Sequence, residues 1–260
     1  TFSNVQFGEG GAGTFSDGKL TTGINNPLCK KVLKDFVSFG APKEIVYLSK
    51  PHIGTDNLIN IIRNMREYMI KNGATFLFNT KVVDFNIKNN KIISLLLKKV
   101  NINNSEIEEM KSDFVILAIG HSSRDTFEKL YTKNFIIKPK NFSVGVRIEH
   151  LQSWINEAQY GKNPNLKLPP AEYKLAYHSN TGRSCYTFCM CPGGVVIASS
   201  SENNTIVTNG MSNFSRNNIN SNSAVLVNVT PEDFNSNSPL EGMYFQKNLE
   251  EKAFNLGGNN

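Results

Sequence analysis

A short apolar run at residues 113–120 (DFVILAIG) is the feature that most limits the folds open to this chain. Every residue from Phe114 to Ile119 is hydrophobic, and the run ends at Gly120. Such an unbroken run is typical of a strand that is buried on both faces, as in a parallel sheet covered by helices. These sheets bind ligands at the carboxyl ends of their strands, which places Gly120 beside the expected site. The run therefore predicts an α/β domain.

The rest of the chain contains both helical and strand patterns. Apolar residues at helical spacing predict helices over 27–39, 54–70, 125–132, 152–159 and 240–254. Hydrophobic segments between turn signals predict strands over 44–48, 74–79, 81–88 and 91–101, with Asn89-Asn90 as a hairpin turn. Alternating patterns after residue 141 predict further strands over 143–149, 183–189, 195–199, 205–210 and 224–230.

The change of pattern at residue 141 divides the chain into three expected parts. Residues 1–140 are expected to form an α/β unit. Residues 141–234 are expected to form an antiparallel unit that is inserted into the first or packed on it, and 235–260 a helix that returns to the first unit. The expected class of the whole chain is therefore α+β.

A second conspicuous feature is the stretch Gly8–Lys19 (GEGGAGTFSDGK), in which five of the twelve residues are glycine. Glycines leave backbone N–H groups accessible, so this stretch suits a loop pressed against a phosphate-bearing ligand. Gly8 to Gly13 also satisfies the pattern G-x-G-x-x-G. That pattern requires an apolar strand before it and a helix after it, and neither flank is of that kind. We interpret the stretch as a ligand-covering loop, with a flexible surface loop as the alternative.

Composition limits the remaining possibilities. The chain has 260 residues, of which 39% are hydrophobic, and no apolar run approaches the 18 or so residues that span a membrane. No membrane partner is therefore expected, and a cytoplasmic location is expected. The net charge of +6 arises from lysines and arginines that are dispersed along the chain. This excess fits a small anionic ligand, whereas nucleic-acid binding would call for a concentrated basic stripe.

Four cysteines are present: Cys29, Cys185, Cys189 and Cys191. The last three form C-x3-C-x-C, which is not a standard zinc spacing, so no metal site is expected. Free thiols in a reducing compartment are the expected state.

Six segments together resemble one family. They are Gly8 to Thr22, 51–56 (PHIGTD), 115–124 (VILAIGHSSR), 142–149 (FSVGVRIE), 168–171 (LPPA) and 188–194 (FCMCPGG). In these segments the chain resembles the bacterial FAD-dependent dehydrogenases of unassigned substrate, which are similar to glutathione-reductase-like flavoproteins. The resemblance covers nearly the whole chain.

The resemblance implies an FAD-dependent oxidoreductase that transfers hydride through the flavin to or from a small-molecule substrate. FAD is the implied cofactor, and NAD(P)H is a candidate electron partner. In such families the FAD-binding fold is discontinuous in sequence. The chain is therefore expected to be an internal fragment without the N-terminal dinucleotide fingerprint. It would contain a partial Rossmann-like sheet layer (1–140) and an inserted antiparallel substrate domain (141–234).

The resemblance also implies which residues contact the cofactor. The glycine loop would lie along the pyrophosphate and the flavin, Val82 would pair its backbone with adenine, and residues 118–120 would pass close to the cofactor. The implied cofactor-binding residues are Gly10, Gly11, Ala12, Gly13, Thr14, Ser16, Asp17, Gly18, Lys19, Leu20, Val82, Ala118 and Gly120.

Several polar residues have both a chemical and a structural interpretation. His121 follows Gly120 directly and is the candidate general acid, with a residue that starts a helix as the alternative. Lys19 offers charge to a reduced flavin or a phosphate, or is simply solvated. Asp17 is a ligand or a turn residue, and His52 is expected to be structural.

Two further pairs have the same ambiguity. Arg147 and Glu149 alternate along one strand, where they form either a cross-strand ion pair or a clamp for a substrate carboxylate. Cys189 and Cys191 are either structural thiols or a redox pair that exchanges electrons with the flavin.

The sequence is also compatible with two other functions. One is a nucleotide or anionic-ligand binding module without redox chemistry, with the glycine loop as its cradle. The other is a flavoprotein that acts on RNA, which the dispersed lysines make the least expected.

Overall fold

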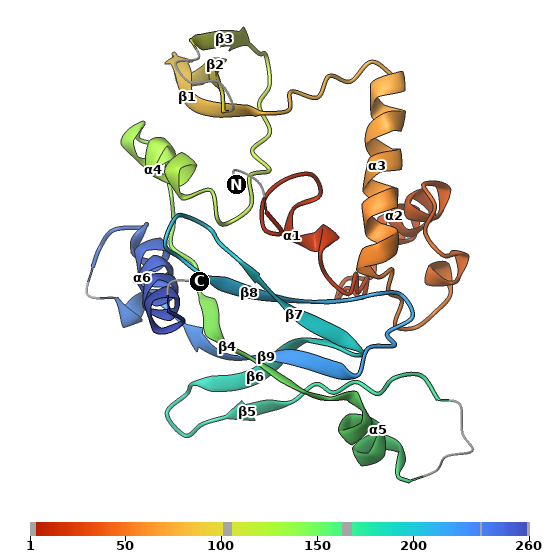
Figure 1. Cartoon of the computed structure of the whole chain (residues 1–260). Coiled ribbons are helices and arrows are strands. Elements are labelled where there is room, and N and C mark those ends of the chain that lie inside the picture. The colour runs from red at the N-terminus through yellow and green to blue at the C-terminus, as the bar shows by residue number, and fades with distance from the viewer. Residues whose placement is uncertain (1–3, 101–105, 163–167, 235, 259–260) are drawn as a thin grey trace.

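A computed structural model of the chain describes residues 4–100, 106–162, 168–234 and 236–258. Within these ranges the chain forms a mixed α+β structure with three antiparallel sheets (Figure 1). The expected class is confirmed. No helix in these ranges is long and apolar enough to cross a membrane.

The N-terminal part of the described chain is helical. It contains the single turn α1 (Gly11–Thr14), α2 (Pro27–Ser38), the 3-10 helix η1 (Lys43–Val46) and α3 (Thr55–Lys71). Helix α2 begins where the Asn26 side chain accepts a hydrogen bond from the Leu28 amide at 2.9 Å, which caps the helix. The buried residues Ala41, Ile45, Ile53, Leu58 and Ile61 form the core between α2, η1 and α3.

The strand expected at 44–48 is wrong. Local hydrogen bonds close a 3-10 turn there, from the Ile45 amide to Pro42 O at 3.3 Å and from the Tyr47 amide to Glu44 O at 3.1 Å. Ile45 is nevertheless buried, as its hydrophobicity predicts. The predicted burial of Ile45 is therefore confirmed, whereas the predicted strand conformation is wrong.

A three-stranded sheet follows in the order β1 (Thr80–Lys88), β2 (Lys91–Lys99) and β3 (Ile107–Lys111). The β1–β2 hairpin turns at Asn89 and Asn90, whose φ angles are 51° and 58°. Asparagine tolerates this left-handed conformation, so the expected hairpin is confirmed. The strand expected at 74–79 is wrong, because these residues form a connection without a sheet partner. Asn101, the last residue of the strand expected at 91–101, lies outside the described residues.

The C-terminal part is built on a four-stranded sheet in the order β4-β9-β6-β5. Its strands are β4 (Phe142–Leu151), β5 (Ala176–His178), β6 (Ser184–Cys191) and β9 (Asn220–Val229). A two-stranded ribbon of β7 (Gly194–Ser199) and β8 (Val207–Ser212) lies between this sheet and the N-terminal helices (Figure 1). The expected strands after residue 141 are therefore present, and helices α5 (Gln152–Tyr160) and α6 (Glu241–Leu256) occur where helices were expected.

The apolar run at 113–120 is the main correction. It forms no strand, and Phe114 and Ile116 are 91% and 90% exposed. All strand pairings in the described residues are antiparallel, so the expected parallel sheet is not formed there. A strand needs a partner edge, and none of the three sheets reaches this segment. The run leads instead into α4 (Arg124–Thr132), which was expected at 125–132.

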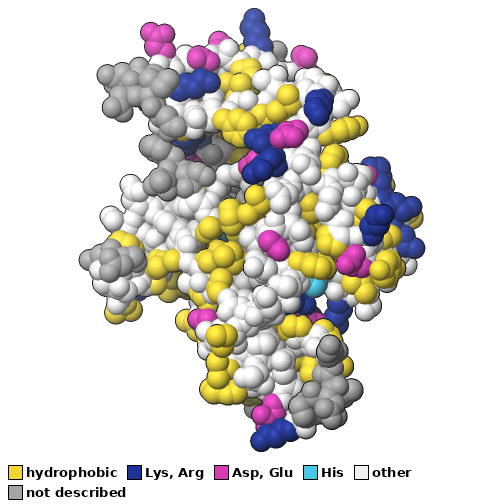
Figure 2. Space-filling view, turned by 45° about the vertical axis from the view of Figure 1, so that its right-hand side comes forward, with side chains coloured by type: hydrophobic (Ala, Val, Ile, Leu, Met, Phe, Trp, Pro, Cys, Tyr) yellow, Lys and Arg dark blue, Asp and Glu magenta, His cyan; other side chains and the backbone are white. Residues whose placement is uncertain are grey.

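The surface has no dominant basic stripe on the face drawn in Figure 2. Lys and Arg side chains occur there at several separate places, with hydrophobic side chains exposed between them. This distribution agrees with the dispersed lysines of the sequence.

Candidate functional site

A cavity of about 490 Å³ lies between the loop at 16–21 and strand β6. Four cationic side chains and one carboxylate line it: Lys19, Lys50, Lys174, Arg216 and Glu172. A cavity of this size is in the range that holds a small molecule. The excess of cations favours an anionic ligand.

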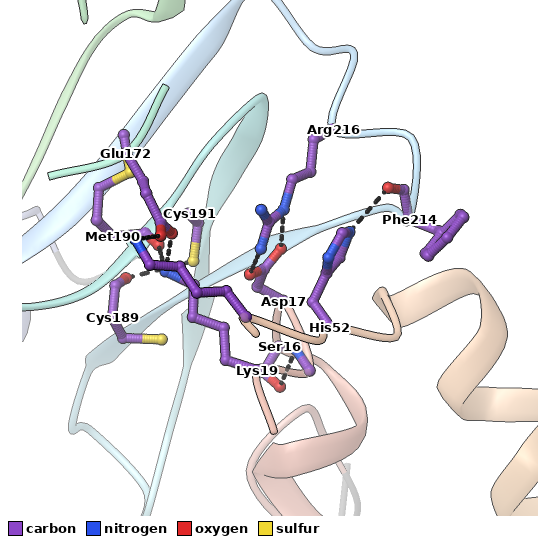
Figure 3. A network of polar contacts seen from close by, with 12 residues as sticks. Ser16, Asp17, Lys19, His52, Glu172, Cys189, Met190, Cys191, Phe214 and Arg216 are labelled. Atoms are coloured by element: carbon purple, nitrogen blue, oxygen red, sulfur yellow. Dashed lines mark hydrogen bonds and ion pairs between the residues drawn. The ribbon is translucent and has the colours of Figure 1, made fainter. Parts of the chain in front are cut away.

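An ion pair fixes one wall of this cavity. Arg216 Nε donates to Asp17 Oδ1 at 2.9 Å, and Arg216 Nη2 donates to Asp17 Oδ2 (Figure 3). The Asp17 and Arg216 side chains are only 1% and 13% exposed. A buried carboxylate requires such a partner, so the pair holds the 16–21 loop against the segment after β8. The carboxylate of Asp17 is thereby occupied by Arg216.

A second contact joins the same two segments. His52 Nε2 lies 3.0 Å from Phe214 O, and the two rings stack with centroids 5.1 Å apart. The Phe214 amide also donates to Asp56 Oδ1 at 2.9 Å, at the start of α3. These contacts agree with the structural role predicted for His52.

Lys19 crosses the floor of the cavity rather than extending into solvent. Its Nζ donates to Met190 O at 2.6 Å and to Glu172 Oε2 at 3.2 Å (Figure 3). Lys50 Nζ donates to Glu172 Oε1 at 2.9 Å. Burial opposes the charge of Glu172, but the hydrogen bonds and charges of Lys50 and Lys19 outweigh it and lower its pKa to about 2. Glu172 is therefore ionised at neutral pH and holds both lysines.

Cys189 lies on the cavity wall, at an irregularity in β6. The β6–β9 register shifts between Phe188 and Cys191, and Cys189 has a φ of 53°, in the left-handed region. Its carbonyl accepts hydrogen bonds from Arg147 Nη1 at 3.3 Å and from the Cys191 thiol at 3.3 Å. All four cysteines are free thiols, as expected.

The two neighbouring thiols have different acidities. Hydrogen bonding by the Cys191 side chain lowers the pKa of Cys189 to about 6, against the opposing effect of burial. The positive charges of Lys19 and Arg147 act in the same direction. The same hydrogen bond, together with burial, raises the pKa of Cys191. At neutral pH the more accessible sulfur is therefore the thiolate.

A second cavity, of about 750 Å³, lies between β4, β9, β8 and α6. His121 and Arg147 are among its lining residues, and the rest of its wall is largely aliphatic. Arg147 Nη1 donates to Asn222 Oδ1 at 2.6 Å, while Glu149 accepts a hydrogen bond from Asn220 at 2.8 Å. The described residues thus show Arg147 paired with an amide, and the ion-pair interpretation of Arg147 and Glu149 is wrong.

Buried polar atoms without partners occur beside this second cavity. Arg147 Nε and Asn222 Nδ2 are buried without a hydrogen-bond partner in the described structure. His121 is exposed and lies 3.5 Å from Ser122 Oγ. Buried donors of this kind require an acceptor such as an ordered water or a ligand atom.

The sequence-predicted cofactor residues are spread over five parts of the fold. Ser16, Gly18 and Lys19 line the first cavity, whereas Val82 lines a separate cavity of about 200 Å³ between β1 and α4. Gly10, Gly11, Ala12, Gly13 and Thr14 form the α1 turn and its entry, which pack on α3. Leu20 pairs its amide with Pro51 O at 3.0 Å. Ala118 and Gly120 lie in the exposed run before α4.

One contact does bring two of these places together. The Gln6 side chain, just before the glycine stretch, donates to Ser122 Oγ, just after the apolar run. Asn4 continues this contact by donating to Ser200 O at 2.9 Å, at the end of β7. The start of the glycine stretch and the end of the apolar run therefore lie side by side.

Sequence reasoning missed Arg216, Glu172 and Arg124 as organising residues. Arg216 and Glu172 are separated from their partners Asp17 and Lys19 by 199 and 153 residues. Arg124 is buried and joins Glu202 at 3.2 Å to Glu250 at 2.6 Å, which ties α4 to α6. No short-range spacing signals such pairs. Among the described residues there is also no cluster of three or more possible metal ligands.

Comparison with known proteins relates the C-terminal part of the chain to a family. Residues 141–260 match the model of a family described as FAD-dependent protein, C-terminal domain-like. The chain is also 50% identical over 260 residues to an uncharacterized protein of Clostridium beijerinckii, in an alignment that covers 99% of this chain and 47% of that protein. The chain thus spans about half the length of this relative. The family match supports a relationship of the C-terminal part to FAD-dependent proteins.

Proposed function

We propose that this chain, whose residues 141–260 are similar to the C-terminal domain of FAD-dependent proteins, is part of an FAD-dependent oxidoreductase. The family match is the observation that carries the proposal. A flavin, when bound, supplies the hydride or electron transfer itself, so the protein has to provide binding, orientation and exclusion of water.

Three glycines of this chain are suited to line one side of an FAD site. Gly11, Gly13 and Gly120 have no atom within 4 Å of the position that a Cβ would occupy, so a ligand can approach their backbone closely. The Gln6 and Ser122 contact keeps the glycine stretch beside the end of the apolar run. In this proposal the glycine stretch and residues 118–120 bind the cofactor, with Val82 at its adenine end.

In the same proposal the cavity beside Lys19 holds a small anionic substrate. Lys50, Lys174 and Lys19 supply positive charge, while Glu172 orients two of them through hydrogen bonds. NAD(P)H is the candidate electron partner, because flavins accept hydride from nicotinamides. His121, the candidate general acid of the sequence, lines the second cavity and not the cavity beside Lys19, so this proposal assigns it no proton transfer to the substrate.

The test is an absorption spectrum of the full-length protein. A flavoprotein purifies yellow, is bleached by reductant without oxygen, and regains its colour in air. FAD added to the apoprotein should raise the melting temperature more than FMN or ATP does. A colourless protein that FAD does not stabilise would refute the proposal. Stabilisation by ATP alone would favour a nucleotide-binding module without redox chemistry.

A further inference from the structure

We propose that Cys189 and Cys191 form a redox-active dithiol on the wall of the first cavity, and that its partner is a small anionic disulfide. Cys189 is the attacking thiol, and Cys191 is the resolving thiol. The proposal concerns thiol chemistry of the chain itself and does not depend on bound flavin.

The two sulfurs differ in their access to the first cavity, as the roles of attacking and resolving thiol require. Cys189 lines the cavity, whereas Cys191 is 0% exposed beneath it. A disulfide in the cavity can therefore reach Cys189 first. The Cys191 thiol donates to the backbone carbonyl oxygen of Cys189 at 3.3 Å, so it lies close to the residue on which a mixed disulfide would form.

The backbone at Cys189 is arranged to present this sulfur. Its left-handed φ of 53° is uncommon for a residue other than glycine, asparagine or aspartate. Such conformations persist where the surroundings hold them, and they cluster at functional sites. Here the Cys189 carbonyl is held by Arg147 Nη1 and by the Cys191 thiol, both at 3.3 Å.

Charges around Cys189 come from three other parts of the fold. Lys19 from the cavity floor and Arg147 from β4 favour the thiolate, while the Asp17 carboxylate opposes it. Asp17 is itself paired with Arg216, which reduces its effect at the sulfur. A thiolate stabilised in this way is nucleophilic near neutral pH, where an ordinary cysteine is mostly protonated.

The cavity also indicates the class of partner. Four cationic side chains and the Glu172 carboxylate line it, and positive charge remains in excess after Glu172 pairs with Lys19 and Lys50 and Asp17 pairs with Arg216. A disulfide that carries carboxylates is therefore attracted, and a cationic disulfide is repelled. A volume of about 490 Å³ admits a small molecule rather than a protein loop.

The reaction balances without any other reactant. The Cys189 thiolate attacks one sulfur of R–S–S–R, so that the S–S bond breaks and one R–S⁻ leaves and takes up a proton. Cys191 then loses its proton and attacks the Cys189 sulfur of the mixed disulfide, which releases the second thiol. The disulfide gains two electrons and becomes two thiols, while the protein dithiol becomes a disulfide between Cys189 and Cys191.

The experiment uses the full chain with Cys29→Ser and Cys185→Ser, so that only the proposed pair remains. The reduced protein is mixed without oxygen with oxidised glutathione, an anionic disulfide, or with cystamine, a cationic one. The readouts are released thiol and intact mass. We expect two thiols released per protein, a mass lower by two hydrogens, and a rate with oxidised glutathione that is roughly tenfold higher than with cystamine.

Single-cysteine variants then assign the roles. Adding Cys191→Ser should stop the reaction at a stable mixed disulfide with one thiol released, and adding Cys189→Ser should abolish it. Melting curves verify that each variant is folded. The proposal is overturned if the Cys189→Ser variant reacts as fast as the parent, or if the parent itself stops at a mixed disulfide. If cystamine reacted as fast as oxidised glutathione, the assignment of an anionic partner would be overturned.

Discussion

Arg216 and Asp17 form a two-pronged ion pair between segments that are 199 residues apart in the sequence. The pair anchors the loop at 16–21 to the segment after β8 and thereby shapes the cavity that Lys19 and Cys189 line. An antiparallel bridge between Lys19 and His52 holds the other side of the same loop, so the loop is fixed from two directions.

Removal of the Asp17 carboxylate should destabilise the protein strongly. In Asp17→Ala the guanidinium of Arg216 loses its partner while it remains largely buried, at a cost of about 3 to 5 kcal/mol. Urea denaturation measures this cost. The matched control is Lys31→Ala, which removes the exposed Lys31–Asp35 pair and should cost about 0.5 kcal/mol or less. Equal losses in the two variants would contradict a structural role for the buried pair.

Because of Glu172, the free energy of unfolding should depend on pH in acidic solution. Its pKa is lowered from 4.5 to about 2 in the folded protein, so its stabilising contribution is present above pH 4.5 and is lost as pH falls through about 2. Glu172→Gln should therefore be less stable than wild type by about 2 kcal/mol at pH 7, a figure reduced for solvent screening of a side chain that is 28% exposed, and this difference should be lost below about pH 2. Denaturation curves at several pH values test this.

Glu157→Gln is the control for that series. Glu157 pairs with Lys162 at 3.2 Å, but its side chain is 54% exposed. Its substitution should change the free energy of unfolding at pH 7 by about 0.5 kcal/mol or less. A difference between wild type and Glu172→Gln that is independent of pH would mean that packing, and not charge, is lost.

Alkylation of Cys189 by iodoacetamide should begin at unusually low pH. Only the thiolate reacts, and the pKa of Cys189 is lowered to about 6, so the rate should rise through pH 6 and level off above it. In Cys191→Ser/Cys29→Ser/Cys185→Ser the profile should change, because a serine hydroxyl replaces the thiol donor. Peptide mass spectrometry assigns the label, and Cys29 in the wild type is the internal reference. If Cys189 and Cys29 became labelled at the same pH, the lowered pKa of Cys189 would be disproved.

The glycine stretch provides a direct test of cofactor binding. Gly13 has no atom within 4 Å of an added Cβ, so Gly13→Ala should leave the melting temperature of the apoprotein nearly unchanged. If FAD lies along this backbone, the added methyl should weaken its binding by roughly tenfold or more, the scale on which binding sites discriminate single methyl groups. Gly23→Ala, at an equally open position outside the stretch, is the control. Equal FAD affinity in both variants would remove Gly13 from the site.

The exposed apolar run should tolerate charge in this chain. Ile116 is 90% exposed, so Ile116→Lys should change the free energy of unfolding by about 0.5 kcal/mol or less. The control is Ile61→Lys in α3, where the residue is 1% exposed and a buried charge should prevent stable folding. A large loss in Ile116→Lys would support the buried strand that the sequence pattern predicts.

Local sequence determined most helices and strands of this protein. Helix α3 follows from an amphipathic period that is complete within 17 residues, and the β1–β2 hairpin follows from two asparagines that accept a left-handed backbone. The conformational preferences behind both act between residues close in sequence. The same reasoning identified Cys189 and Lys19 as chemically notable residues, but it left their roles open.

Tertiary structure alone decided the rest. Residues 113–120 have the composition of a buried strand, yet a strand forms only where another edge accepts its hydrogen bonds, and the described sheets offer none. The pairing of Asp17 with Arg216 and of Lys19 with Glu172, and the β-bulge that presents Cys189, likewise depend on segments far apart in the sequence. Hydrogen bonds and ion pairs at such separations leave no period or spacing in the sequence, because they arise only when packing brings the segments together.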